Sequence, residues 1–182
     1  TAQQMELAKQ EIDYLESIKE NLMIVENERE INELRDELYS QGYHVKRAEK
    51  SKIRKQVSKP LEFKLSDGFV CYVGRNNMQN DKLSLKTAQK SDMWLHTQKF
   101  PGSHVIMVTG GEEPSERDYT EAASVAAYYS KATNDLVAVD YTAVKNIKKP
   151  QGAKPGFVIY KTNYTAFVTP SCDIGRKEEN NG

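Results

Sequence analysis

Residues 60–73 read PLEFKLSDGFVCYV, and this stretch decides the fold class. Leu61, Phe63 and Leu65 alternate with polar residues, which is the period-two pattern of a strand with one buried face. The Ser-Asp-Gly sequence at 66–68 is typical of a turn, and a second apolar run follows it directly. The stretch therefore predicts a β-hairpin.

Further strand-like runs follow the hairpin. They lie at 93–96, 104–108, 136–141, 157–160 and 164–168, and helices are expected at 80–90 and 115–131. The second of these helices has the clearer signal, because Ser115 can cap it and an alanine-rich apolar face follows. Runs of strands with irregularly placed helices indicate an α+β fold with a mixed sheet, rather than a doubly wound parallel sheet.

The segment before the hairpin, residues 1–40, has helical periodicity and contains no proline or glycine. Asn27 followed by Glu30 is typical of a helix N-cap with its capping box, so a break is expected near residue 26, with the second helix ending at Gly42. Two interpretations remain open: a helical pair that packs on itself, or one half of a coiled-coil arm whose other strand lies upstream. In both, the acidic face is expected to stay in water.

The zero net charge, from 26 basic and 26 acidic residues, excludes a uniformly basic nucleic-acid binder but conceals an asymmetry. Residues 1–40 contain 4 basic and 11 acidic residues, whereas residues 41–60 contain 7 basic residues and 1 acidic residue. The basic segment is either a flexible connection or a strap that contacts phosphates. The expected organisation is a helical coiled-coil arm fragment at 1–45, a basic linker at 46–59, an α+β domain at 60–170 and a disordered tail at 171–182.

Several classes of protein are disfavoured by composition. No run approaches the roughly 18 apolar residues that a membrane-spanning helix needs, and no signal peptide is visible. Cys71 and Cys172 are far apart, which indicates a reducing compartment and therefore a cytoplasmic location. The chain begins without methionine in a helical pattern, so we expect it to be a fragment of a larger protein.

Four polar stretches of the second unit could contact a ligand. Arg75, Asn76 and Asn77 follow a strand end, where they form either a turn or a loop that offers a guanidinium fork and two amides to phosphates or bases. Trp94 and His96 share one face of a strand, where the tryptophan is either core or a stacking platform for a base.

The other two stretches contain a turn and a basic loop. Ser103 and His104 follow a Pro-Gly turn, and His104 is either a satisfied histidine of the core or a contact residue. The basic loop contains four lysines, and proline and glycine keep it out of a helix, so it is either a solvated loop or a phosphate-binding one. Its lysines are Lys145, Lys148, Lys149 and Lys154.

Catalysis and metal binding have weak support in the sequence. No nucleophile elbow surrounds Ser103, which argues against a hydrolase. His96, His104 and Cys71 lack the spacing of a zinc site. The sequence therefore predicts no enzyme activity, no metal and no cofactor.

Two blocks of this chain resemble a known family. Residues 92–96 (DMWLH) and 100–106 (FPGSHVI) are similar to the D-x-W-L-H and P-G-S-H-V signature of the NFACT-R domain, and smaller blocks match across about residues 60–168. The helices before them resemble the end of that family's coiled-coil arm. The chain is thus similar to the C-terminal part of the RqcH and fibronectin-binding-protein-A family, which is related to eukaryotic NEMF.

The resemblance implies a module that binds tRNA and the large ribosomal subunit and supports alanine tailing of stalled nascent chains. The alternative is a fragment of a fibronectin-binding adhesin, present on the cell surface without a signal peptide. The expected RNA-binding residues are Arg75, Asn76, Asn77, Trp94, His96, Ser103, His104, Lys145, Lys148, Lys149 and Lys154.

Three physical expectations accompany this assignment. We expect Trp94 to be mostly buried as a support, with His96 and His104 closer to the RNA. A histidine pKa near 6.5 would strengthen RNA binding as the pH falls. The acidic residues of the first 40 positions repel phosphate, so these helices are expected to bind protein rather than RNA.

Overall fold

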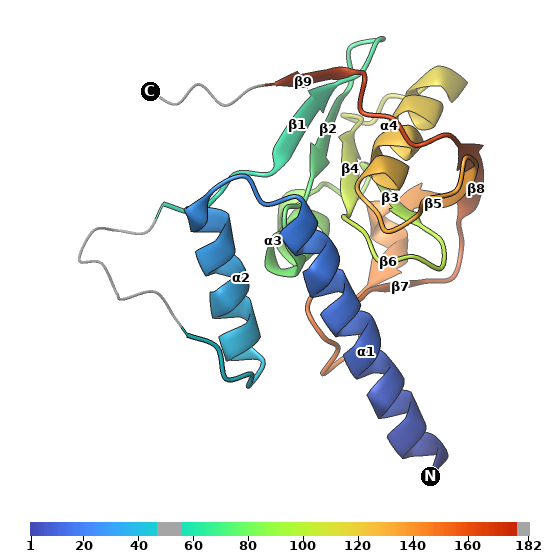
Figure 1. Cartoon of the computed structure of the whole chain (residues 1–182). Helices are drawn as coiled ribbons and strands as arrows, with labels where there is room; N and C mark the ends of the chain where they lie inside the picture. The colour runs from blue at the N-terminus through green and yellow to red at the C-terminus, as the bar shows by residue number, and fades with distance from the viewer. Residues whose placement is uncertain (47–55, 178–182) are drawn as a thin grey trace.

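The protein is described by a computed structural model that covers residues 1–46 and 56–177 (Figure 1). A sheet of seven strands has the order β8-β5-β3-β4-β2-β1-β9. Its strands are β1 (Leu61–Lys64), β2 (Val70–Val73), β3 (Met93–Thr97), β4 (Val105–Val108), β5 (Val137–Ala143), β8 (Tyr164–Val168) and β9 (Gly175–Lys177). Strands β6 (Ile147–Lys148) and β7 (Ile159–Tyr160) form a separate small sheet.

The α+β class is confirmed, but the strand pairs differ from the expected mixed sheet. Each pair in the described residues is antiparallel, including the predicted hairpin, in which Phe63 lies opposite Cys71. The reason lies in the connection through α4 (Glu116–Tyr128). After β4 this helix leads to β5, which pairs antiparallel with β3 instead of forming a parallel partner for β4.

Helix α4 covers one face of the sheet (Figure 1). Ser115 and Asp118 form its capping box, as the serine at this position predicts. Ala122, Ala123 and Ala126 lie within the core, where their small side chains let the helix approach strand residues that are completely buried. The core strand residues include Phe63, Leu95, Val105, Met107 and Val139.

The opposite face of the sheet carries a second, smaller cluster around Trp94 and Ile106. It is covered by Leu83 of the π-helical turn η1 (Leu83–Thr87), which continues α3 (Asn77–Lys82), and by Val144 of the 3-10 turn η2 (Val144–Asn146). The helix expected at 80–90 therefore begins earlier. Asn76 is its N-cap, because the Asn76 side chain accepts a hydrogen bond from the backbone N–H of Gln79.

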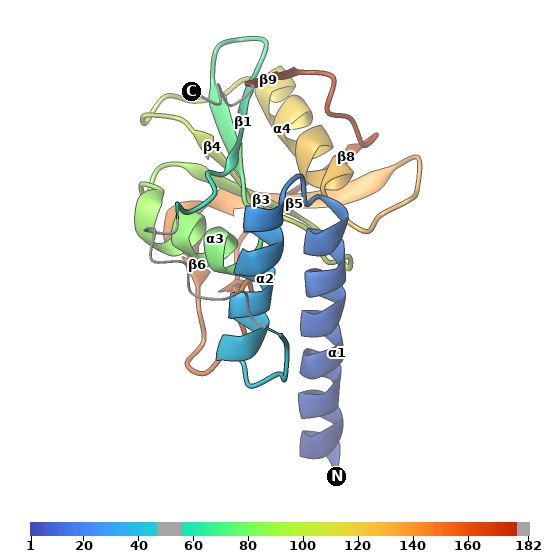
Figure 2. The same cartoon turned by 60° about the vertical axis from the view of Figure 1, so that its left-hand side comes forward.

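Helices α1 (Ala2–Met23) and α2 (Glu28–Ser40) run antiparallel beside the domain, and the N-terminal half of α1 projects beyond it (Figure 2). The predicted break is confirmed, with Asn27 capping α2. The expectation of a wholly solvated acidic face is wrong, since Glu30 and Glu37 are buried. Several apolar residues of α1 are exposed, as one half of a coiled coil would require, but their exposure does not test that interpretation, which stays a prediction. They include Met5, Ile12, Leu15 and Leu22.

The predicted linker at 46–59 and the predicted tail at 171–182 can be compared with the structure only in part. Of the basic linker, residues 47–55 lie outside the described residues, so its role as a phosphate strap stays a prediction. The tail expected to be disordered instead contains β9, which pairs with β1 from Glu62 to Lys64. Within the described part of the chain, no helix is long and apolar enough to cross a membrane.

Candidate nucleic-acid interface

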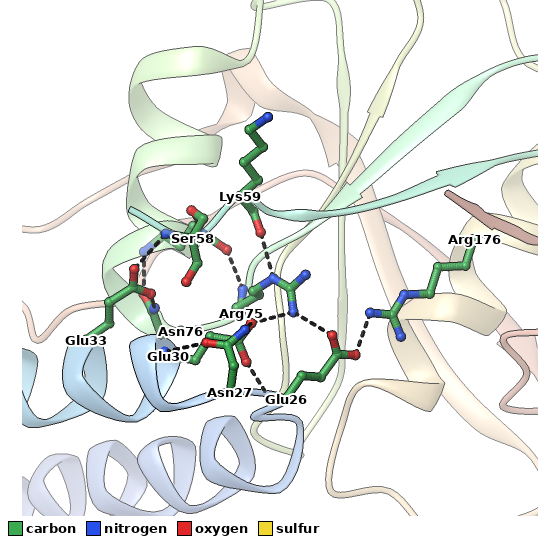
Figure 3. Close-up of polar contacts among 10 residues, drawn as sticks. Glu26, Asn27, Glu30, Glu33, Ser58, Lys59, Arg75, Asn76 and Arg176 are labelled. Carbon is green, nitrogen blue, oxygen red and sulfur yellow. Dashed lines mark hydrogen bonds and ion pairs between the residues drawn. The ribbon is translucent and has the colours of Figure 1, made fainter. Parts of the chain in front are cut away.

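Arg75 packs against the turn between α1 and α2 (Figure 3). Its side chain is only 6% exposed, and its Nη1 lies 2.7 Å from Glu30 Oε1 and 3.3 Å from Glu26 Oε2. Its Nε donates to the backbone carbonyl of Lys59 at 2.6 Å. The guanidinium therefore joins the helical turn to the strand that begins the domain.

The side chains of the two asparagines after Arg75 also contact the helices α1 and α2. Asn76 Nδ2 donates to Glu33 Oε2 at 3.3 Å, and Asn77 Nδ2 donates to Ser17 Oγ at 2.8 Å. Both asparagines are buried, like Arg75. The three side chains therefore hold α1 and α2 on the domain instead of extending into solvent as an open loop, and their contact with RNA stays a prediction. The acidic residues of the two helices were the sequence signal for this contact, because their negative charge complements that of Arg75.

A second cation reaches the same turn from the other end of the chain. Arg176, next to last in β9, donates to Glu26 Oε1 (Figure 3). Burial alone would raise the pKa of Glu26, but the hydrogen bond and charge of Arg176, together with Arg75, lower it. The turn between the helices is thus held by two arginines, one just after β2 and one in β9.

Trp94 is the centre of an aromatic cluster on the second face of the sheet. It is 2% exposed, as expected of a support. His96 stacks on it with ring centroids 5.7 Å apart and an interplanar angle of 9°, and His104 meets it edge-on at 5.3 Å. Tyr160 from β7 lies 5.1 Å from the same ring. The cluster therefore joins the main sheet to the small sheet.

His104 is more deeply placed than the sequence suggested. It is buried, and its Nε2 lies 2.9 Å from the carbonyl oxygen of Gly156, while its Nδ1 lies 2.8 Å from Ser84 Oγ. A neutral ring satisfies both contacts, with Nε2 donating and Nδ1 accepting. Burial, assisted by the nearby His96, lowers the pKa of His104 to about 3. His104 therefore has a structural role, in which its ring connects Ser84 to the loop at Gly156.

His96 is half-buried and is the histidine closer to solvent. Its Nδ1 lies 2.7 Å from the carbonyl oxygen of Thr97, and burial lowers its pKa. Its Nε2 lies 3.2 Å from the carbonyl oxygen of Gly102, so a charged ring donates at both nitrogens, whereas a neutral ring donates at only one. The strengthening of RNA binding as the pH falls from 7.5 to 6 therefore stays a prediction for His96, whereas burial opposes a charge on His104.

Ser103 is also buried rather than exposed to a ligand. Its backbone N–H donates to the carbonyl oxygen of Tyr129 at 2.9 Å, at the end of α4. Beside it, a Cβ on Gly102 would lie 2.8 Å from the Cβ of Ser130. The Pro-Gly-Ser loop is therefore constrained by close packing against α4, which explains its glycine.

The four lysines of the basic loop separate into two pairs. Lys149 lies 3.0 Å from Asp81 Oδ2 and donates to the carbonyl oxygen of Lys154 at 2.8 Å. Lys154 lies 3.3 Å from Glu11 Oε2 and 5.3 Å from the ring centre of Tyr14. These two are engaged within the chain. Lys145 and Lys148 are exposed, and no carboxylate of the described residues forms an ion pair with either.

A groove of about 920 Å³ lies between α1 and the domain. Sequence reasoning missed it because its walls come from three separate segments, whose contact depends on Lys154 meeting Glu11 and Asn77 meeting Ser17. His96 lines it, together with Lys9, Gln10 and Asp13 of α1 and residues of the 97–102 and 150–158 loops. In the described residues, no group of three histidine, cysteine or acidic side chains is placed to hold a metal ion.

Comparison with known proteins identifies the central part of this chain. Residues 59–162, more than half of the chain, match the family described as NFACT protein RNA binding domain. The protein named Rqc2 homolog RqcH from Bacillus subtilis is 40% identical over 94% of this chain, and its namesake from Streptococcus suis is 43% identical over 93%. The chain spans only 30% of the length of each.

A solved structure has the same fold. The C-terminal part of the fibronectin/fibrinogen-binding protein from Streptococcus suis matches with a TM-score of 0.85 and 42% sequence identity. The match covers 94% of this chain and 68% of that one. The arm helices therefore belong to the shared architecture together with the domain.

Proposed function

This chain belongs to the NFACT RNA-binding domain family, and on that premise we propose that it is the C-terminal RNA-binding module of a ribosome-associated quality-control factor in the cytoplasm. It binds tRNA and the large ribosomal subunit, and through them supports alanine tailing of stalled nascent chains. It has no catalytic chemistry of its own. The relatives named Rqc2 homolog RqcH support this proposal, although the chain spans 30% of their length.

The observation that carries the proposal is the pair of exposed lysines on the basic loop. Lys145 and Lys148 are exposed in η2 and β6, without an ion pair to the described residues. The neighbouring Val144 and Ile147 are buried, so the backbone that carries these lysines is anchored. Cations on an anchored backbone lose little conformational entropy when they meet phosphates, and each releases counterions from RNA.

The test is a salt titration of tRNA binding. Replacing both Lys145 and Lys148 by alanine should weaken binding and reduce the slope of log affinity against log salt by about 0.7–0.9 for each lost contact. The matched control is Lys64→Ala with Lys86→Ala, which removes the same charge from exposed positions elsewhere. An unchanged slope in the first variant, with the fold intact, would reject this loop as the phosphate contact.

A second candidate is binding to fibronectin, which the name of the structural relative favours. An interface with apolar anchors depends less on salt than phosphate contacts do. The same titration with fibronectin in place of tRNA therefore separates the two. Tight, salt-resistant binding to fibronectin and none to tRNA would favour the adhesin function and a cell-surface location.

A further inference from the structure

Several aromatic rings line the groove between α1 and the domain. His96 is half-buried and stacks on Trp94, so it forms the outer member of a two-ring stack. Phe157, 49% exposed, and the half-buried Phe100 and Tyr160 also line the groove. Flat rings of this kind bind nucleobases by stacking, without regard to base identity.

The charges of the groove nearly cancel. It is lined by three lysines (Lys9, Lys99 and Lys154) and three acidic residues (Asp13, Glu16 and Asp140). Several of these are already engaged. Asp140 accepts hydrogen bonds from Gln98, Thr165 and Tyr160, Lys154 pairs with Glu11, and Glu16 pairs with Lys131. The exposed charges that remain without an ion pair among the described residues are Lys9, Lys99 and Asp13.

This balance distinguishes the groove from the basic loop. Two separated lysines can each meet a phosphate, but the groove as a whole has no large positive potential. Its affinity for RNA must therefore come mainly from stacking and from side-chain amides such as Gln10 and Gln151 at the edges. A volume of about 920 Å³ lies within the range of ligand sites.

We propose that the groove between α1 and the domain binds an unpaired base of RNA, stacked between His96 and Phe157, with Lys9 and Lys99 beside the flanking phosphates. This inference rests on the proposed RNA-binding function and names the part of the RNA that is read. Because Lys9 and Gln10 come from α1, the arm helix and the domain bind the base jointly. The arm thereby has a role in RNA binding beyond the protein contact expected from its acidic composition.

The neutral state of the rings suits this arrangement. Burial lowers the pKa of His96, which favours the uncharged ring, and this ring lies parallel to that of Trp94 with an interplanar angle of 9°. Lys99 has a φ of 61°, which is uncommon for a residue other than glycine. Lys99 lies in the 97–102 loop, which forms one wall of the groove.

The first measurement uses the single tryptophan of the chain. A short single-stranded oligoadenylate of roughly six nucleotides, within the site sizes of single-strand binders, is titrated into the whole chain, and a blunt RNA duplex is titrated in parallel. We expect a saturable change in Trp94 fluorescence with the oligoadenylate only, because its base stacks on the ring adjacent to Trp94. The affinity of this probe should vary little with salt compared with that of tRNA.

Two pairs of variants locate the site. Phe157→Ala should weaken oligoadenylate binding about tenfold, which is the loss of one modest stacking contact. Phe167→Ala is the matched control, since Phe167 is 67% exposed and lies outside the groove. Gln10→Phe should narrow the groove from the side of α1 and weaken binding, whereas Ile12→Phe, at an exposed α1 position outside the groove, should not.

The outcomes separate this inference from the function on which it rests. If Phe157→Ala and Gln10→Phe bind the oligoadenylate as the unaltered chain does, the groove is not the site, and tRNA binding through the basic loop still stands. The same conclusion follows if the duplex changes Trp94 fluorescence as strongly as the single strand. If neither tRNA nor the oligoadenylate binds, the proposed function and the groove both fail.

Discussion

Replacing Arg75 by methionine tests whether the buried ion pair fixes the arm on the domain. Methionine keeps much of the apolar volume but removes the guanidinium, which leaves the Glu30 carboxylate, with a side chain 4% exposed, without its cation at 2.7 Å. Breaking a buried pair in this way costs about 3–5 kcal/mol. The cost lies at the lower end of this range, because the Glu30 carboxylate keeps one hydrogen bond, which the backbone N–H of Glu26 donates to its Oε2. We expect a loss of about 3 kcal/mol in the free energy of unfolding.

The assay is urea unfolding of a double-mutant cycle. Glu30→Gln alone should also be destabilising, and the double variant should recover much of the loss, since neither charge then remains unpaired. The pH dependence gives an independent check. The pKa of Glu26 is lowered in the folded state, so its contribution is present above the unfolded pKa, near 4.3, and is lost as the pH falls below it. Two results together would refute a coupled buried pair. The free energy of unfolding of Arg75→Met would fall by less than about 1 kcal/mol, and the effects of the two single substitutions would add up to that of the double variant.

Two other predictions concern the aromatic cluster and its neighbouring loop. The pKa of His104 is about 3, below its unfolded value near 6.5, so the unfolded state binds the extra proton between these values and stability falls as the pH decreases through that range. His104→Gln should flatten this dependence in urea unfolding, and an equally steep dependence would show that another group causes it. Gly156→Ala places a Cβ 2.4 Å from Asn77 Oδ1 at a φ of +83°, and we expect a loss of about 1–3 kcal/mol. The control Gly152→Ala has a similar φ of +75° but no atom within 4 Å, so equal losses in thermal unfolding would contradict the steric explanation.

Local signals in the sequence predicted local structure well. The alternation at 60–73 predicted the hairpin, and Asn27 and Ser115 predicted the helix starts, because caps and strand periodicity depend on residues close in sequence. The burial of Trp94 was also expected. In each case the information lies within a few residues.

The positions that sequence reasoning misplaced depend on distant partners. Arg75 lies 45 positions after Glu30 in the sequence, and no local pattern shows that a basic residue after a strand packs against a helical turn rather than lying in solvent. His104 is buried because Gly156 supplies its acceptor from a loop far along the chain. Sequence reasoning assigned the polar residues to the correct domain, but their contacts depend on tertiary packing.

Strand β9 also protects the sheet against self-association. It pairs with Glu62, Phe63 and Lys64, and so covers backbone donors and acceptors of β1 that would otherwise form an open edge. An open edge is a template for pairing with another chain. A protein shortened to the domain boundary expected at residue 170 would therefore expose the edge of β1, and we expect it to aggregate more readily than one that retains Arg176.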